Sequence, residues 1–186
     1  MKIVQPIRDK NMIELLKQEL LKSKTRDYML FVFGINTGLR ISDILRMKVI
    51  DVKNRTHITL TEQKTKKTKK IKITHTLSVE LNRYMIDKDT TDFLFPSQKD
   101  SKDGSKKAIS RIQAYRILNR AANACGIDEE IGTHSLRKTF GYHHYQLFKD
   151  VALLQDIFNH SAPSVTLRYI GLNQDCIDMS MDNFGL

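Results

Sequence analysis

The chain lacks the features that several classes of protein require. It has two cysteines, Cys125 and Cys176, which form neither a CxxC pair nor a disulfide framework. A chain that needs no disulfide is typical of a reducing compartment, so we expect a cytoplasmic protein. The first residues, MKIVQPIRDKN, lack the apolar segment of a signal peptide, and the longest apolar run, residues 29–33, is far too short to cross a bilayer. We therefore expect no membrane span.

Motifs for the common cofactors are also missing. The six histidines occur in no HExxH motif and in no Cys/His ligand spacing, so we do not expect a metal centre. The chain has no GxxxxGK[ST] loop or GxGxxG turn for a nucleotide, and no GxSxG elbow for a serine hydrolase. We predict a protein that works without a metal or another cofactor.

What the chain has in excess is positive charge. Its 31 Lys and Arg against 21 Asp and Glu give a formal net charge of +10. Such a surplus favours a polyanionic partner, most often nucleic acid and less often an acidic membrane, although ribosome-associated and merely basic proteins share it. The stretch KTKKTKKIK, residues 64–72, holds six lysines in nine positions. It is either a solvated hairpin tip or a site where an anion screens the charge, and composition alone leaves both open.

The hydrophobic pattern predicts a mainly α domain with a small antiparallel β-hairpin, an α+β fold. Met12, Leu15, Leu16 and Leu20 are expected on one face of a first helix that Asp9 caps. There is no internal repeat, no Pro/Gly-rich linker and no βαβ alternation, so we expect one domain over residues 1–186 and not a Rossmann-type fold. The expected helices are 9–22, 25–36, 41–47, 78–88, 109–125, 134–148, 150–158 and 163–170, with a hairpin over 56–74.

Four short segments carry residues that could meet an anion. In NTGLRISDIL, Arg40 begins a short helix after a glycine turn, which suits a phosphate, although a surface pair with Asp43 is the simpler reading. Lys64 lies at the hairpin tip in EQKTKK. In HSLR, His134 and Arg137 are three residues apart and share a helix face.

The fourth segment, FNHSAPSVTLRYIG, has His160 at an expected helix end and Tyr169 nine residues later. Two arginines, a lysine and two imidazoles could surround a phosphate and stabilise its oxygens during attack. A tyrosine could then act as the nucleophile and store the phosphodiester bond energy as a phosphotyrosine, so that no ATP is needed.

In this order and spacing, the segments resemble the catalytic domain of the tyrosine recombinases, the phage-integrase family, over about residues 4–169. The resemblance implies a site-specific DNA recombinase or integrase that cleaves and rejoins double-stranded DNA through a 3′-phosphotyrosine. It assigns Tyr169 as the nucleophile, and Lys64 as the general acid for the leaving 5′ oxygen. The residues expected to stabilise the pentacoordinate phosphate are Arg40, Arg137 and His160. His134 would assist proton transfer or bind phosphate, and Asp43 would support the site.

The lysines that follow Lys64 are expected to bind DNA: Lys66, Lys67, Lys69 and Lys70. The residues after Tyr169 hold an amphipathic pattern of Ile177, Met179 and Met181. In the family such a tail often packs on a neighbouring protomer, so we expect self-association on DNA through the tail.

Two departures from the family pattern are visible. Phe158 and Asn159 stand where Leu-Gly commonly precedes the histidine. An N-terminal core-binding domain is expected to be absent, so the sequence is either a fragment of a longer integrase or a natural single-domain relative. The rival readings are a type IB topoisomerase, an inactive DNA-binding regulator with the same fold, and a basic RNA-binding or ribosomal protein.

Overall fold

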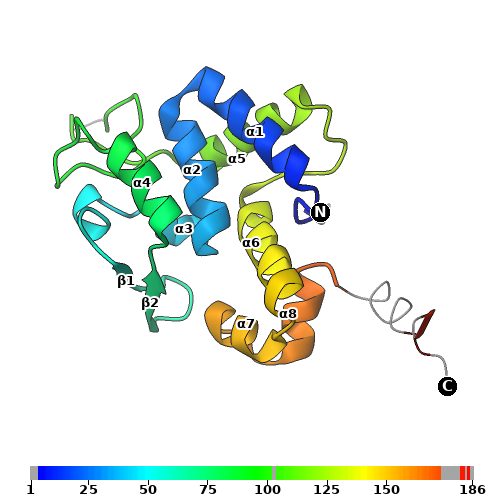
Figure 1. Cartoon of the computed structure of the whole chain (residues 1–186). Helices are drawn as coiled ribbons and strands as arrows, with labels where there is room; N and C mark the ends of the chain where they lie inside the picture. The colour runs from blue at the N-terminus through cyan, green and yellow to red at the C-terminus, as the bar shows by residue number, and fades with distance from the viewer. Residues whose placement is uncertain (1–3, 102–103, 173–180, 183, 185–186) are drawn as a thin grey trace.

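The structure is a computed structural model that describes residues 4–101, 104–172, 181–182 and 184. Within these ranges the chain is mainly helical with one two-stranded antiparallel sheet, as predicted (Figure 1). The elements are α1 (Lys10–Ser23), α2 (Thr25–Thr37), α3 (Ile41–Ile44), the 3-10 helix η1 (Val49–Asp51), β1 (His57–Thr61), β2 (Thr68–Lys72), α4 (His75–Tyr84), α5 (Arg111–Ala124), α6 (Thr133–Phe148), α7 (Val151–Phe158) and α8 (Pro163–Tyr169). In the described part of the chain, no helix is long and apolar enough to cross a membrane.

Most of the helices surround one large core. Helix α2 contacts α1, α4 and α6, and α5 contacts α1 and α6. The name "large core" is used below for the main cluster of buried apolar side chains, which includes Leu16, Phe31, Phe33, Ile58 and Leu118. In α1 the buried face is formed by Ile13, Leu16 and Leu20. The expectation that Leu15 shares this face was wrong, since its side chain is exposed and the buried positions repeat at i, i+3 and i+7.

The hairpin was predicted correctly, although its second strand begins at Thr68 and not at Lys70, where the alternation in the sequence suggested it. β1 pairs with β2 in antiparallel register from His57 opposite Lys72 to Thr61 opposite Thr68. Helix α4 also begins earlier, at His75 and not near residue 78, and ends at Tyr84. The cause is Thr74, whose hydroxyl accepts the Leu77 N–H at 3.3 Å and caps the helix.

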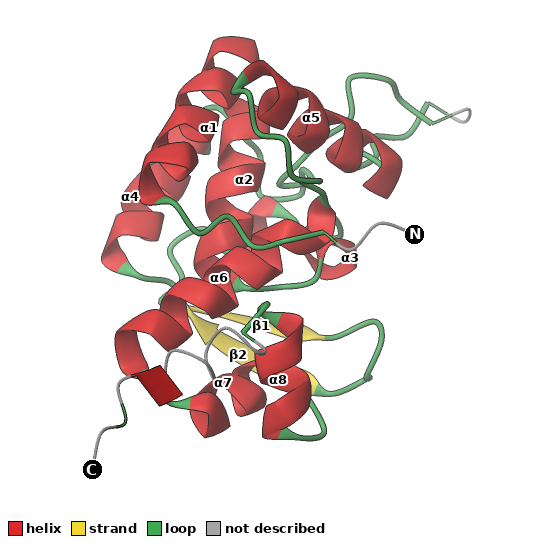
Figure 2. Ribbon diagram, turned by 90° about the vertical axis from the view of Figure 1, so that its right-hand side faces the viewer, coloured by secondary structure: helices red, strands yellow, loops and turns green. Residues whose placement is uncertain are grey.

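The C-terminal helices form a smaller region beneath the main bundle (Figure 1). The name "small core" is used below for its buried apolar side chains, Leu154, Phe158, Ile170 and Leu172. Gly141 of α6 permits this packing, because a Cβ atom there would lie 2.6 Å from Ile170 and 2.7 Å from Phe158. Figure 2 shows the hairpin beside α7, and side-chain contacts from Lys67 and Lys69 to the end of α7 agree with that view.

The expected association tail lies mostly beyond the described residues. Ile177 and Met179 fall outside them, while the side chain of Met181 is exposed. The proposed role of the tail therefore stays a prediction.

Candidate active site

Arg137 joins the two regions of the molecule. Its guanidinium is buried and donates through Nη1 to the Gly38 carbonyl at 2.5 Å and through Nη2 to the Phe158 carbonyl at 2.8 Å. Gly38 ends α2 with a φ of 61°, a conformation that favours glycine, and so turns its carbonyl toward α6. Burial lowers the pKa of Arg137 to about 10, so the group stays cationic at neutral pH. A fixed positive charge thus lies between α2 and α7.

Arg40 begins α3, as predicted, but its partner is not the one that the sequence suggested. The Arg40 Nη1 atom lies 2.6 Å from Oε1 of Glu62, so the simple pair with Asp43 was wrong. The buried Asp43 carboxylate instead accepts the Gln63 N–H at 2.9 Å and lies 3.3 Å from Arg46. Asp43 therefore fixes the start of the hairpin turn, because its carboxylate holds the Gln63 N–H.

Glu62 and Lys69 form a buried ionic pair that the sequence reading missed. The Glu62 side chain is 1% exposed and lies 3.5 Å from the Lys69 ammonium, which also donates to the Ile157 carbonyl. Burial lowers the pKa of Lys69 to about 8, and the charge of Arg137 acts in the same direction. Strand alternation was the available signal: Glu62 follows Ile58 and Leu60 at period two, and Lys69 precedes Ile71 and Ile73.

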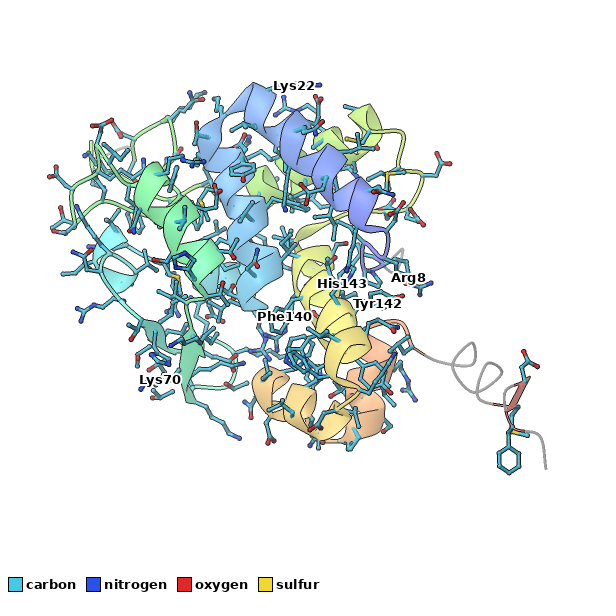
Figure 3. All side chains as sticks on the ribbon, in the orientation of Figure 1. Arg8, Lys22, Lys70, Phe140, Tyr142 and His143 are labelled. Atoms are coloured by element: carbon cyan, nitrogen blue, oxygen red, sulfur yellow. The ribbon has the colours of Figure 1, made fainter. Side chains whose placement is uncertain are left out.

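The other predicted lysines lie on the outside of the hairpin. Lys64, in the turn after β1, is exposed, as are Lys66, Lys67 and Lys70. Lys67 donates to the Asn159 side chain at 3.0 Å, which links the hairpin to the end of α7. Figure 3 shows Lys70 on the outer side of the hairpin, away from α6. The charge of Lys64 makes a small contribution to lowering the pKa values of His134 and His160.

His160 and Tyr169 lie together at the edge of the small core. Their ring centroids are 5.2 Å apart, and the His160 Nδ1 atom is 3.1 Å from the buried Thr166 hydroxyl. Burial, followed by the charges of Arg137 and Arg40, lowers the pKa of His160 to about 4, so the imidazole is neutral at pH 7. Burial raises the pKa of the Tyr169 phenol, and the same two arginines partly offset the rise. A nucleophilic Tyr169 would therefore need a proton acceptor.

His134 lies at the rim of the group and not at its centre. Its side chain is exposed, whereas Arg137 on the same helix is buried. The His134 Nε2 atom is 3.3 Å from Arg111, and desolvation followed by the charge of Arg111 lowers the pKa of His134. The Lys138 ammonium lies 5.4 Å from the centroid of the Tyr169 ring.

The structure thus brings Arg40, Arg137, His160 and Tyr169 into one neighbourhood, with Lys64 and His134 at its border. The name "cationic pocket" is used below for Arg40, Lys69 and Arg137 with the Glu62 carboxylate between them. Among the described residues, no group of three or more His, Cys, Asp or Glu is placed to hold a metal ion. Cations with a phenol at their edge can bind an anion and stabilise the charge that develops when it is attacked.

Solved structures of similar fold define the class. The crystal structure of XerA recombinase superposes with a TM-score of 0.74 at 19% identity, covering 99% of this chain and 68% of that one. The pre-cleavage complex of the XerH site-specific recombinase with its difH substrate gives a TM-score of 0.70 at 19% identity, covering 99% and 56%. The fold is that of a tyrosine recombinase catalytic domain.

Sequence comparison identifies the family. The model described as "Phage integrase family" matches residues 5–175, and the chain belongs to this family. "Probable integrase/recombinase YoeC" of Bacillus subtilis is 54% identical over 185 residues, covering 100% of this chain and 99% of that protein. A tyrosine recombinase of Pseudothermotoga lettingae is 30% identical over 148 residues, covering 78% and 49%. The chain thus spans nearly all of YoeC but about half of this longer relative.

Proposed function

We propose that the chain is a site-specific recombinase catalytic domain that cleaves and rejoins double-stranded DNA through a 3′-phosphotyrosine, without metal or ATP. The observation that carries this proposal is the position of Arg137. Its guanidinium lies 4.2 Å from the centroid of the Phe158 ring, which packs edge-on against the Tyr169 ring, and its charge lowers the pKa of the phenol against the effect of burial. A nucleophile and a phosphate-binding cation are thus next to each other.

The reaction assigns a role to each predicted residue. The Tyr169 oxygen attacks the scissile phosphorus, and the bond from phosphorus to the 5′ oxygen breaks. Lys64 gives a proton to the leaving oxygen, and the neutral His134 is available to accept the tyrosine proton or to bind the phosphate. Arg40, Arg137 and His160 stabilise the pentacoordinate phosphate. In the reverse step a 5′ hydroxyl attacks the phosphotyrosine, which restores the DNA and the phenol.

The neutral state of His160 fits this role. The Thr166 hydroxyl lies 3.1 Å from Nδ1 and 3.5 Å from the Ala162 carbonyl; when it donates to Nδ1, the proton of the imidazole is on Nε2 and can be donated to a phosphate oxygen. Asp43 supports the site through the Gln63 N–H, since this bond fixes the residue next to Lys64.

The partner in this proposal is double-stranded DNA in the cytoplasm. Lys66, Lys67 and Lys70 are exposed on the hairpin and are available to phosphates on either side of the cleavage point. Solved structures of similar fold include XerH bound to difH and a lambda integrase dimer bound to a core site. We propose that copies of this chain also associate on DNA, through the tail after Tyr169.

A covalent-capture experiment tests the chemistry. The protein is incubated with a pool of nicked duplexes, randomised around the nick, and adducts that survive SDS are isolated. Wild type and Tyr142→Phe should form an adduct, because Tyr142 is away from the pocket and contacts Arg8 (Figure 3). Tyr169→Phe should form none. The yield should be the same in EDTA, since side chains neutralise the phosphate.

Two results would contradict the proposal. An adduct that persists in Tyr169→Phe would remove this residue as the nucleophile. The absence of an adduct from the whole pool, with folded wild-type protein, would favour an inactive DNA-binding role.

A further inference from the structure

Glu62 is a buried acid in the middle of the cationic pocket. Its Oε1 atom lies 2.6 Å from the Arg40 Nη1 atom and 3.5 Å from the Lys69 Nζ atom. Its Oε2 atom accepts the Thr65 hydroxyl at 2.6 Å. Burial raises the pKa of Glu62, but the Thr65 hydroxyl and the two cations outweigh it, so the net pKa is lowered and the carboxylate is charged at neutral pH.

The three cations need such a charge when no DNA is present. Arg40 and Arg137 both lower the pKa of Lys69, and Arg40 lowers that of Arg137, so the cations repel one another. Like charges in a partly buried site destabilise the fold unless an anion lies among them. Glu62 supplies that anion from within the chain.

The contact between Arg40 and Glu62 is close but poorly directed. Although Nη1 and Oε1 are 2.6 Å apart, neither buried atom has a well-directed hydrogen bond within the described residues. The pair is therefore held by charge and not by the bidentate geometry that arginine prefers with a carboxylate. A phosphate could engage the guanidinium in the preferred geometry.

Glu62 also closes the turn that carries Lys64. Its carbonyl accepts the Lys66 N–H at 3.0 Å, and its own N–H donates to the Lys67 carbonyl at 3.0 Å. The Thr65 hydroxyl bond ties the carboxylate to the same turn. A change in the balance between Glu62 and Arg40 would therefore reach the hairpin tip directly.

We propose that Glu62 is a built-in counter-anion of the cationic pocket and a positioning residue of the reaction. It holds Arg40 and Lys69 in place before DNA binds, and its charge then opposes the incoming phosphate. Lys69 accordingly serves the pocket and not the outer DNA-binding surface of the hairpin. This rests on the proposed function, since it takes the pocket as the place where a phosphate binds.

The test is Glu62→Gln, which keeps the shape of the side chain and removes its charge. Inorganic phosphate is titrated at constant ionic strength and pH 7, and binding is followed by calorimetry and by the melting temperature. The melting temperature without phosphate should fall, while phosphate should bind about tenfold more tightly, a change of about 1.4 kcal/mol. A purely structural role predicts that both stability and affinity fall.

Asp27→Asn is the matched control. Asp27 is 2% exposed and lies 2.7 Å from Arg26, so it is also a buried carboxylate paired with arginine, but away from the pocket. It should lose stability with no change in phosphate affinity. In an Arg40→Ala background, Glu62→Gln should no longer tighten binding by the same factor. Unchanged or weaker phosphate binding by Glu62→Gln would overturn the proposal.

Lys69→Met provides a second test, should Glu62→Gln fail to fold. Phosphate binding should weaken by about three- to tenfold in this variant, because the pocket loses a cation; unchanged affinity would overturn the assignment of Lys69.

Covalent capture tests the proposed chemistry separately from phosphate binding. If wild type forms adducts but Glu62→Gln binds phosphate no more tightly, the counter-anion role of Glu62 is contradicted and the proposed recombinase chemistry is supported. No adduct, with the affinity gain present, supports the counter-anion and contradicts the recombinase chemistry.

Discussion

The large core and the small core carry different parts of the site. Arg40 and Glu62 are held by elements that pack on the large core, which extends through α1 to α6 and the hairpin. His160 and Tyr169 belong to the other region, whose buried apolar side chains, within the described ranges, are those of Leu154, Phe158, Ile170 and Leu172. The proposed phosphate-binding side is thus supported by many more buried apolar side chains than the side that carries the proposed nucleophile.

Hydrogen bonds between the two regions add to the support of the small-core region, which has fewer buried apolar side chains. Arg137 bonds to Gly38 on one side and to Phe158 on the other, and Lys69 reaches from the hairpin to the Ile157 carbonyl. The same cations are the ones expected to bind phosphate. If the proposed site binds phosphate, DNA binding and the position of Tyr169 are linked, because the phosphate would compete for the side chains that hold the end of α7.

The largest effect should come from removing the central ring of each core. Phe33→Ala and Phe158→Ala each empty a fully buried site, and such changes cost about 3–5 kcal/mol. In Phe158→Ala, amide hydrogen exchange should accelerate in α7 and α8 while α2 stays protected, because Phe158 contacts Tyr169 and Phe140 in the small core. In Phe33→Ala, exchange should accelerate throughout. Equal acceleration in both variants would mean that the two cores unfold as one.

Arg137→Lys should have a smaller effect on stability but a severe one on activity. Lysine keeps the charge but cannot bond to Gly38 and Phe158 with a planar fork, so one carbonyl loses its donor at a cost of about 1–3 kcal/mol. Urea unfolding measures this loss, and covalent capture should show little adduct. Arg26→Lys is the control for a change of cation type, because Arg26 is paired with Asp27 and donates to the Pro96 carbonyl, away from the site. An equal loss of adduct there would show that the test does not isolate Arg137.

Local sequence signals predicted the elements whose ends carry their own caps and turns. Arg40 at the start of α3 and Gly38 at the end of α2 were found in this way. The start of α4 was missed because Thr74, the residue that caps it, was assigned to the strand. Helix ends of this kind depend on one hydroxyl, which a hydrophobic pattern does not register.

The pocket was predicted only in part. The motif order indicated Arg40, Arg137, His160 and Tyr169, and the fold brings them together. Glu62 was not found, because attention went to the lysine-rich run after it, for which a solvated tip and an anion-binding site were both left open. Its partner Lys69 donates to the Ile157 carbonyl at the end of α7, which is 88 residues away in the sequence. Only the tertiary structure brings these segments together.

Acid should lower the free energy of unfolding through His160, and this change should be smaller than those expected for the substitutions above. The pKa of His160 is lowered to about 4 in the folded protein, while the ordinary value is 6.5. Between these values the unfolded chain binds more protons, so His160 makes stability fall as the pH drops from about 6.5 toward 4. The urea midpoint should therefore fall less between pH 7 and pH 5 in His160→Gln than in wild type. His144→Gln should reduce the pH dependence of the urea midpoint in the same direction, because burial lowers the pKa of His144 as well. An identical pH dependence in wild type and His160→Gln would show that the imidazole beside Tyr169 is not held in its neutral form by the fold.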